Sequence, residues 1–551
     1  DHANLTLEEM KQTTCDMELL DAQLTEMKEL AAEAEAAGEA KDPERVKELF
    51  GETLDEVEKL STCYSLSQIT YYQNIFDEEN QEIQAELLDD VMDYGDRLNV
   101  SIRELCKSPY QNTMTELMNA EQVEAYLEYE EMTDEEKELT AKENSLEQEY
   151  EQLSSEEFYY EYDGEEWDLN RLNMEADEMD HDAVVEIYQG ICKQRNDAVG
   201  EVFVELVDVR NEIAKLNGYD NYAEYAYDAV YVRDYTLDET RDLLKEIRKH
   251  VVPVMADMKD VLNDTDYMRL YSEGQGIEST SIIEQIGPYL EEIDPELKDT
   301  QEHFLKYRLY DMDTSQNKAN TAFTMRLSYF KDGFIYGQMY DNYMDYYNVI
   351  HEFGHYNNVY RSADTFFESS NNIDVSEIHS QGMQILFYDY YDELLGEDIG
   401  DIYAFYDVYS MADNAISTAL ISEFEIAAYE NPDMTLEELN KLYLQLSRRY
   451  GMQYDSKIKE LYTWSEVPHI FTSPCYYFSY LTSAFSSLDI LTMAEEDRHE
   501  AVETYMTLTT IPGYVPYCSA VEYAGLRDIF DDGVAQDIIE ETASILGVKG
   551  Y

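Results

Sequence analysis

The chain has 551 residues, of which 44% are hydrophobic, so it can bury a large core spread over several domain-sized units. Its formal net charge is −83 at pH 7, from 121 acidic and 38 basic residues, and this argues against non-specific binding to nucleic acid or anionic lipid. We interpret most of these carboxylates as a solvated surface; electrostatic steering of cationic peptides is the alternative interpretation.

The sequence predicts neither a membrane span nor a disulfide framework. No apolar run approaches the ~18 residues of a transmembrane helix, and the six cysteines are scattered without a CxxC pair. The sequence starts at Asp1 with no signal-like stretch. The missing initiator Met and the acidity slightly favour an extracytoplasmic bacterial location, secreted or surface-attached, over a cytoplasmic one. We expect a monomer or a weak dimer.

The first part of the chain is predicted to be helical. From Leu5 to about Ser154 apolar residues recur at three- and four-residue spacing, which is typical of long amphipathic helices. The stretch 128–168 is dense in Glu and Tyr, and we expect it to form a solvated helical surface or connection. A soft boundary there divides the chain into an N-terminal helical lobe or lid, 1–168, and a catalytic domain, 169–551.

Helical patterns continue after this boundary. A strong pattern from Asp182 to Leu216 runs into Asn217-Gly218, where glycine can adopt the left-handed conformation that ends a helix. Between Ala322 and Met339 the residues instead favour strands, with Asp332-Gly333 as the expected hairpin turn. Helices resume from Asn342. The prediction is a mostly α-helical protein with one small β-sheet.

The main chemical signal follows that sheet. His351-Glu352-Phe353-Gly354-His355 is an HExxH pattern on a predicted helix. A spacing of four residues places both imidazoles on one helical face, where both can reach one Zn²⁺. Glu352 would lie near the open side of that metal and accept a proton from its water. The pattern therefore predicts a zinc site with Glu352 as general base.

A catalytic zinc usually needs a third protein ligand. Glu377 lies 22 residues after His355 on a second predicted helix and is our preferred candidate. His379 is the competing candidate, because imidazole is the commoner zinc ligand. We favour Glu377 because His379, two residues further on, would face another side of the same helix.

Four segments resemble the M3 family of zinc oligopeptidases, particularly its oligoendopeptidase F-like branch. HEFGH at 351–355 followed by DVSEIHS at 374–380 is the strongest match, and Asp345 also fits the family pattern. The segments 210–222 and 469–480 are similar to an upstream helical signature and to the segment that supplies the family's transition-state residues. The resemblance covers about 182–548.

The resemblance implies a two-lobed helical metallopeptidase with a deep central cleft and a small β-sheet beside the HExxH helix. It implies one Zn²⁺ per chain, held by His351, His355 and Glu377, and Glu352 as general base. His469 and Tyr480 would stabilise the oxyanion, and Tyr477 is the next candidate. The substrates would be short oligopeptides, because a deep cleft excludes folded proteins.

Some positions depart from the family pattern or allow two interpretations. Asn358 and Gln384 stand where many relatives carry a His and an acidic residue, which puts the rate and the metal affinity in doubt more than the type of reaction. Tyr336, Gly337 and Gln338 belong to a segment, 333–338, that resembles the family's edge strand beside the cleft, where an extended peptide would pair. The alternative interpretation is a core strand.

We therefore expect a zinc metalloendopeptidase acting on oligopeptides. One alternative is a carboxypeptidase or dipeptidyl carboxypeptidase, which would need a cation such as Arg326 to bind the terminal carboxylate of the substrate. A second alternative is a non-catalytic peptide-binding protein. The presence of Glu352 argues against it, because binding alone does not need a base.

Overall fold

Helices make up most of the computed structural model, which describes residues 2–128, 132–176, 179–274, 276–362, 372–454 and 457–551. The N-terminal helices are α1 (Leu7–Met10), α2 (Met17–Ala37), α3 (Pro43–Gln73), α4 (Glu78–Lys107), α5 (Gln111–Leu117), α6 (Ala120–Glu128) and α7 (Asp134–Ser154). The middle helices are α8 (Leu169–Glu175), α9 (His181–Leu216), α10 (Tyr222–Tyr225), α11 (Leu237–Glu246), α12 (Val252–Lys259), α13 (Asp264–Ser272), α14 (Ser279–Gln285), α15 (Gly287–Ile293) and α16 (Pro295–Tyr307). The C-terminal helices are α17 (Met344–Arg361), α18 (Ile373–Leu386), α19 (Tyr391–Leu395), α20 (Glu397–Glu430), α21 (Leu436–Arg449), α22 (His469–Thr472), α23 (Phe478–Glu496), α24 (Arg498–Leu508), α25 (Tyr517–Ala524) and α26 (Val534–Ile545).

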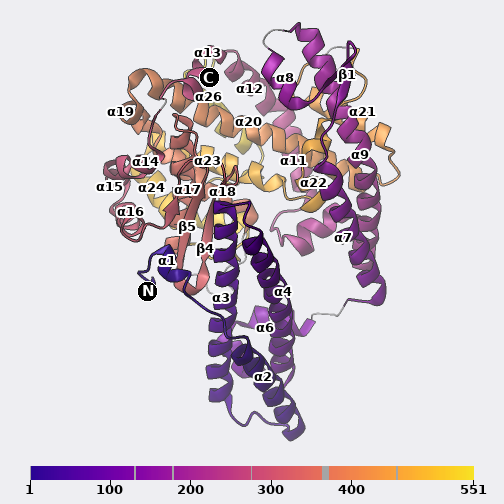
Figure 1. Ribbon diagram of the computed structural model, residues 1–551, viewed down its shortest axis with the longest axis vertical. Helices are drawn as coiled ribbons and strands as arrows, with labels where there is room; N and C mark the ends of the chain where they lie inside the picture. The colour runs from indigo at the N-terminus through magenta and orange to yellow at the C-terminus, as the bar shows by residue number, and fades with distance from the viewer. Residues whose placement is uncertain (1, 129–131, 177–178, 275, 363–371, 455–456) are drawn as a thin grey trace.

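Helices α2 to α6 form a separate core and extend away from the rest of the molecule (Figure 1). Asp16, Asp42 and Asp77 precede α2, α3 and α4, and each side chain accepts a hydrogen bond from a backbone N–H of the first turn. Gly38, at φ 71°, ends α2 in the left-handed conformation. The acidic residues of this region therefore begin its helices as well as solvating their surfaces.

The larger core includes α1, the C-terminal end of α3, α7 and nearly all of the chain from α9 onward. Leu66 and Ile69 of α3 belong to it, whereas Leu49 and Leu60 of the same helix belong to the N-terminal core. The two cores thus meet along α3, which also contacts β4, while α7 lies against α9. The predicted helix from Asp182 to Leu216 is confirmed as α9, with Gly218 at φ 86° just beyond it.

Two small sheets are present in the described part of the chain, although only one was predicted. The first pairs β1 (Tyr160–Tyr162) with β2 (Glu165–Trp167), antiparallel, within the stretch expected to be helical or a connection. Asp163 and Gly164 between them both have positive φ, as a tight hairpin turn requires. The Asp-Gly pair was the sequence signal for this hairpin.

The second sheet is the predicted one and lies beside α17 (Figure 1). Its strands are β3 (Tyr310–Asp311), β4 (Ala322–Leu327) and β5 (Asp332–Gly337), in the order β3-β5-β4, with β5 parallel to β3 and antiparallel to β4. The expected turn at Asp332-Gly333 is wrong. Leu327 pairs with Asp332, so residues 328–331 make the turn, with Lys331 in the left-handed conformation at φ 51°.

The prediction of an edge strand at 333–338 is also wrong, because β5 is the central strand of this sheet. Tyr336 pairs with β3 and β4 at once, Gly337 pairs with β4, and the backbone N–H of Gln338 donates to Thr321. The core-strand interpretation holds for this segment. Strand β4 lies at the edge instead, and its residues before Leu327 are half-buried.

Within the described residues, the structure contains no helix of the length and apolar character needed to span a membrane.

Candidate metal and catalytic site

Helix α17 carries the whole HExxH pattern, as predicted. Its N-terminal end is fixed by Asp345, which is buried and accepts hydrogen bonds from the backbone N–H groups of Tyr340 and Asp341 at 2.9 and 2.7 Å. This explains why an acidic residue stands six positions before the first His of the motif. His351 and His355 lie one turn apart, each partly exposed.

Helix α18 packs closely on α17 at Gly354. A Cβ on Gly354 would collide with the backbone carbonyl oxygen of His379 and lie 2.7 Å from the Cα of Ser380. Both of these atoms belong to the backbone of α18, which cannot move aside as a flexible side chain could. The glycine of the motif therefore permits the close approach that brings Glu377 of α18 to the two imidazoles of α17.

The structure brings His351, His355 and Glu377 together, with one potential ligand atom from each within 4.8 Å of the others. Oε2 of Glu377 lies 3.4 Å from Nε2 of His351 and 3.4 Å from Nε2 of His355. Ligand atoms bound at about 2.0–2.1 Å to a tetrahedral ion lie roughly 3.3 Å apart. Two neutral imidazoles and one carboxylate at this separation fit a zinc ion.

The electrostatics of the three side chains also favour a cation between them. Burial alone would lower the pKa of His351, but the hydrogen bond and charge of Glu377 raise it to about 9. Burial alone would raise the pKa of Glu377, whereas the charge of His355 and hydrogen bonds from both imidazoles hold that pKa well below its usual value. The carboxylate of Glu377 and the two imidazoles thus form a group of donor atoms, one of them negatively charged, that suits a shared cation.

Gln384 and Asp407 orient His351 from behind. Nδ1–H of His351 donates to Oε1 of Gln384 at 2.9 Å, which leaves Nε2 facing Glu377. The amide nitrogen of Gln384 donates to the buried carboxylate of Asp407, and the hydroxyl of Tyr391 donates to the same carboxylate at 3.1 Å. Position 384 thus holds an amide in place of an acidic residue, and the carboxylate comes from Asp407 of α20, which reaches His351 through Gln384.

Glu352 directly follows His351 on α17 and is buried. The hydroxyl of Thr324 in β4 lies 2.8 Å from its Oε2 and 2.9 Å from its backbone carbonyl oxygen, so it can donate to either. The charge of Glu352 contributes to the raised pKa of His351. The edge strand of the sheet therefore positions the predicted base.

His379 does not join this group. Burial lowers its pKa to about 3, and its Nδ1 lacks a hydrogen-bond partner among the described residues. Its backbone carbonyl accepts a hydrogen bond from Tyr505 at 2.7 Å. Asn358 donates to the carbonyl of Thr509 at 3.2 Å, on the side of α17 that faces the C-terminal helices.

The predicted oxyanion residues form an aromatic cluster around α22 and the start of α23. His469 lies with its ring 5.1 Å from that of Tyr477 and 6.0 Å from that of Tyr480, centroid to centroid. Burial and then neighbouring charges raise the pKa of each tyrosine; the charge of Glu377 acts on Tyr480, and that of Glu425 acts on Tyr477. The charge of a candidate metal ligand thus contributes to the raised pKa of Tyr480.

Tyr476 is a candidate that sequence reasoning missed. It stacks on His469, with centroids 5.6 Å apart and planes 26° apart. Burial raises the pKa of Tyr476, and the charge of Glu377 raises it further. The charge of Glu377 also raises the pKa of Tyr480. Tyr476 and Tyr480 are four residues apart, and this spacing was the available signal.

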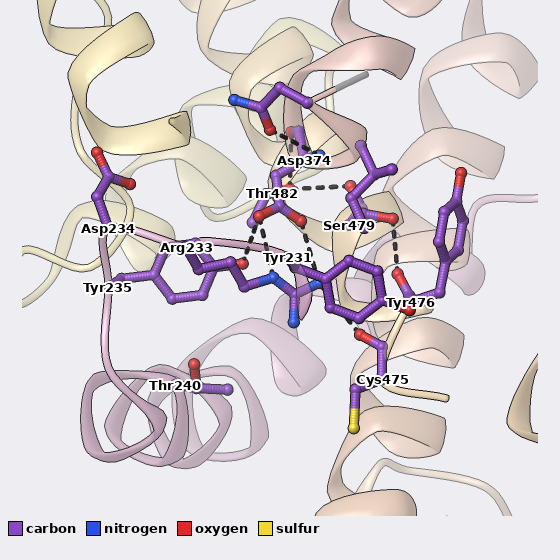
Figure 2. Close-up of polar contacts among 12 residues, drawn as sticks. Tyr231, Arg233, Asp234, Tyr235, Thr240, Asp374, Cys475, Tyr476, Ser479 and Thr482 are labelled. Atoms are coloured by element: carbon purple, nitrogen blue, oxygen red, sulfur yellow. Dashed lines mark hydrogen bonds and ion pairs between the residues drawn. The ribbon is translucent and has the colours of Figure 1, made fainter. Parts of the chain in front are cut away.

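A buried ion pair holds α18 and the loop before α23 in place (Figure 2). Nε and Nη2 of Arg233 donate to the two carboxylate oxygens of Asp374 at 3.1 and 3.2 Å, and Nη2 also donates to the carbonyl of Cys475 at 3.1 Å. The Tyr235 hydroxyl donates to Asp374 at 2.8 Å. Asp374 begins the helix that carries Glu377, and Cys475 precedes Tyr476, so this ion pair links the two halves of the candidate site.

Two hydroxyls of α23 complete this link. Thr482 and Ser483 both donate to the backbone carbonyl of Asp374, at 2.9 and 3.0 Å. Cys475 has φ 62°, a conformation that non-glycine residues rarely adopt, and its backbone N–H donates to Glu425 at 2.9 Å. The backbone that presents Tyr476 is thus held in an uncommon conformation by buried partners.

Two side chains proposed for substrate binding, those of Tyr336 and Gln338, have hydrogen-bond partners outside this group. The hydroxyl of Tyr336 lies 2.7 Å from the backbone carbonyl oxygen of Tyr72 and 2.9 Å from that of Ala319, so it can donate to either. The side-chain oxygen of Gln338 accepts from the N–H of Ser315. Arg326, on the edge strand, donates to Ser362 at 2.9 Å.

No family model matches the sequence, and no curated protein matches it. Solved structures match along almost the whole chain. A protein described as an oligoendopeptidase F and a complex of PZ peptidase A with an inhibitor each give a TM-score of 0.75 at 23% identity, over 99% and 97% of both chains respectively. A Bacillus anthracis protein described as an oligoendopeptidase F gives 0.71 at 23% identity over 97% of both chains. The chain therefore has the oligoendopeptidase F-like fold, as the resemblance predicted.

Asp374→Asn should lower the free energy of unfolding by about 3–5 kcal/mol, because it leaves the fully buried Arg233 without its counter-charge. Urea unfolding followed by tryptophan fluorescence measures this, since both tryptophans lie outside α2–α6. Asp238→Asn, in the exposed pair with Arg241, is the control and should change stability by less than about 1 kcal/mol. Equal stability of the two variants would contradict the structural role of the buried pair.

Proposed function

We propose that the protein is a zinc-dependent endopeptidase that cleaves oligopeptides. The observation that carries the proposal is the cluster of His351, His355 and Glu377 with Glu352 next to it on the same helix. A non-catalytic binding protein would need the fold but not this base. The fold likeness to oligoendopeptidase F structures supports the same class of substrate.

The three ligands and Glu352 have separate roles in this proposal. A zinc ion held by His351, His355 and Glu377 would act as a Lewis acid that polarises the scissile carbonyl and acidifies a water. Glu352 accepts a proton from the attacking water and then donates it to the leaving amine. The Thr324 hydroxyl holds the carboxylate of Glu352 in one orientation while this proton moves.

His469, Tyr480 and Tyr476 would stabilise the developing negative charge. Imidazole N–H and phenol O–H groups that are already oriented lower the free energy of an oxyanion without reorganising. Burial lowers the pKa of His469, so its imidazole is neutral near pH 7 and can donate from one nitrogen. Burial and the charge of Glu377 keep Tyr480 protonated as a donor.

The metal ligands can be tested without measuring activity. Glu377→Ala should weaken zinc binding by more than the roughly 10 to 100-fold expected for loss of an outer partner, because it removes a ligand itself. His379→Gln is the matched variant on the same helix and should keep zinc. Inductively coupled plasma mass spectrometry of the dialysed proteins measures the zinc content of both variants. Loss of zinc from the His379 variant alone would reverse the assignment.

Glu352→Gln should lower kcat by about 10²–10⁴ while zinc stays bound, because the amide cannot accept the proton of the water. The assay is mass spectrometry of a mixed peptide pool incubated with the protein, with a chelator and with the variant. Internal cleavage by the wild type alone is expected. Trimming only from the C-terminus would indicate a carboxypeptidase, and intact peptides with a zinc-loaded wild type would favour a binding protein.

Tyr480→Phe should lower kcat by about 10²–10³ with little change in KM, because its hydroxyl is needed only as the oxyanion forms. Tyr477→Phe removes a hydroxyl whose pKa is raised by burial and by the charge of Glu425, not by that of Glu377, and should cause a smaller loss of kcat. Steady-state kinetics on one cleaved peptide compares them. A larger loss of kcat in Tyr477→Phe than in Tyr480→Phe would mean that Tyr477, and not Tyr480, stabilises the oxyanion.

A further inference from the structure

A cavity of about 380 Å³ lies directly behind the candidate metal site. It is enclosed by residues of α13, α17, α18 and α20. Two of them touch His351: Gln384 accepts its Nδ1–H, and the ring of Tyr347 stacks on its imidazole at 5.3 Å. The cavity thus shares a wall with the site where a peptide bond would be cleaved, and its volume falls within the roughly 300–1,000 Å³ of ligand pockets.

The lining of this cavity combines one buried carboxylate with several aromatic rings. Asp407 is buried, and none of the described residues that line the cavity is a Lys or Arg. Four tyrosines also line it: Tyr267, Tyr347, Tyr403 and Tyr406. A carboxylate among aromatic faces is an environment that attracts a cation, by charge and by cation–π interaction.

Two buried polar atoms in this lining have no hydrogen-bond partner among the described residues. They are the hydroxyl of Tyr403, in a residue 2% exposed, and the side-chain oxygen of Gln381, in a residue 8% exposed. A buried polar group without a hydrogen bond costs about 1–3 kcal/mol of folding free energy. A bound molecule that forms hydrogen bonds with these two atoms would remove that cost. The oxygen of Gln381 can only accept, which requires a donor.

Asp407 also retains capacity to accept hydrogen bonds. Its carboxylate takes one bond from Gln384 and one from Tyr391, and two carboxylate oxygens can accept about four. Among the described residues, the charges and hydrogen bonds that act on Asp407 come from Tyr391, Gln384 and His351 rather than from a Lys or Arg. Burial raises the pKa of Asp407 to about 6, so the group is ionised at pH 7.5.

The remaining lining suits an aliphatic stem. Leu270, Met344 and Met411 contribute apolar surface, and Ser410 and Asn414, both exposed, connect the cavity to solvent. Arginine and lysine combine a methylene stem with a donor-rich cationic head. Peptides that carry them are also attracted by the net charge of −83.

We propose that this cavity is a specificity pocket for an arginine or lysine side chain of the peptide substrate, with Asp407 as its counter-charge and Gln381 and Tyr403 as hydrogen-bond partners. The proposal rests on the proposed peptidase function, because two residues that line the cavity, Gln384 and Tyr347, also contact His351. The four tyrosines would hold the cationic head, and the methionines would pack on its stem.

Matched peptides test the preference. Arginine is replaced at each position around the cleavage site by citrulline, which keeps the shape but loses the charge, and lysine is replaced by norleucine. At the one peptide position whose side chain enters the cavity, replacing arginine with citrulline should lower kcat/KM of the wild type by about 10-fold or more. In the Asp407→Asn variant, the ratio of kcat/KM for the arginine peptide to kcat/KM for the citrulline peptide should fall toward one. The ratio is the readout, because Asp407 also holds Gln384 and its substitution can slow every peptide equally.

Ser410→Lys provides a second variant that is expected to fold, since Ser410 is exposed at the mouth of the cavity. The added cation should reduce the same ratio by repulsion, while Ser410→Gln should leave it unchanged. A wild type without any preference for arginine or lysine, or a preference that survives both Asp407→Asn and Ser410→Lys, would overturn the proposal.

Binding measured on Glu352→Gln separates this inference from the proposed function. Nα-acetyl-arginine amide should bind more tightly than its citrulline counterpart in calorimetry, and Asp407→Asn should remove the difference. If the wild type cleaves peptides but shows neither binding nor preference, only the pocket assignment fails. If the arginine amide binds through Asp407 but no peptide is cleaved, the cation site stands and the peptidase function fails.

Discussion

The candidate site depends on one close contact, the packing of α18 against α17 at Gly354. A side chain at this position would collide with the backbone of α18, so only glycine allows the helices to come this near. The contact brings a carboxylate of one helix within 3.4 Å of two imidazoles of the other. The remaining interactions of the site either hold this helix pair in place or add groups around it. The Arg233–Asp374 pair fixes the start of α18, and Thr324 of β4 orients the base on α17.

The same interactions give the site a layered arrangement. The ligand atoms face one another in front, while Gln384 and Asp407 lie behind His351 and determine which of its nitrogens is free. Asp407 borders both this hydrogen-bond chain and the cavity behind it. A cation bound by Asp407 would therefore be linked to His351, a candidate metal ligand, through the side chains of Asp407 and Gln384. Recognition of a substrate side chain and orientation of His351 share one carboxylate in this account.

Local patterns in the sequence predicted the helical character, the helix of the HExxH pattern and the carboxylate on the following helix, because each depends on residues close together in the chain. Contacts between distant segments were not predictable in this way. The central place of β5 depends on the two-residue strand β3, and the link from His351 to Asp407 spans 56 positions, which no periodicity records. The β1–β2 hairpin did have a local signal, Asp163-Gly164, but the surrounding acidic and aromatic residues suggested a solvated helix instead. The four-residue spacing of Tyr476 and Tyr480 was likewise visible but not used.

The most direct test of the central claim is a crystal structure of the zinc-loaded protein with anomalous scattering recorded on both sides of the zinc edge. The proposed zinc site requires one strong peak per chain, about 2.0–2.1 Å from Nε2 of His351, Nε2 of His355 and one carboxylate oxygen of Glu377. A peak bound by His379 in place of Glu377, or the absence of a peak between α17 and α18 in protein that contains zinc, would contradict it.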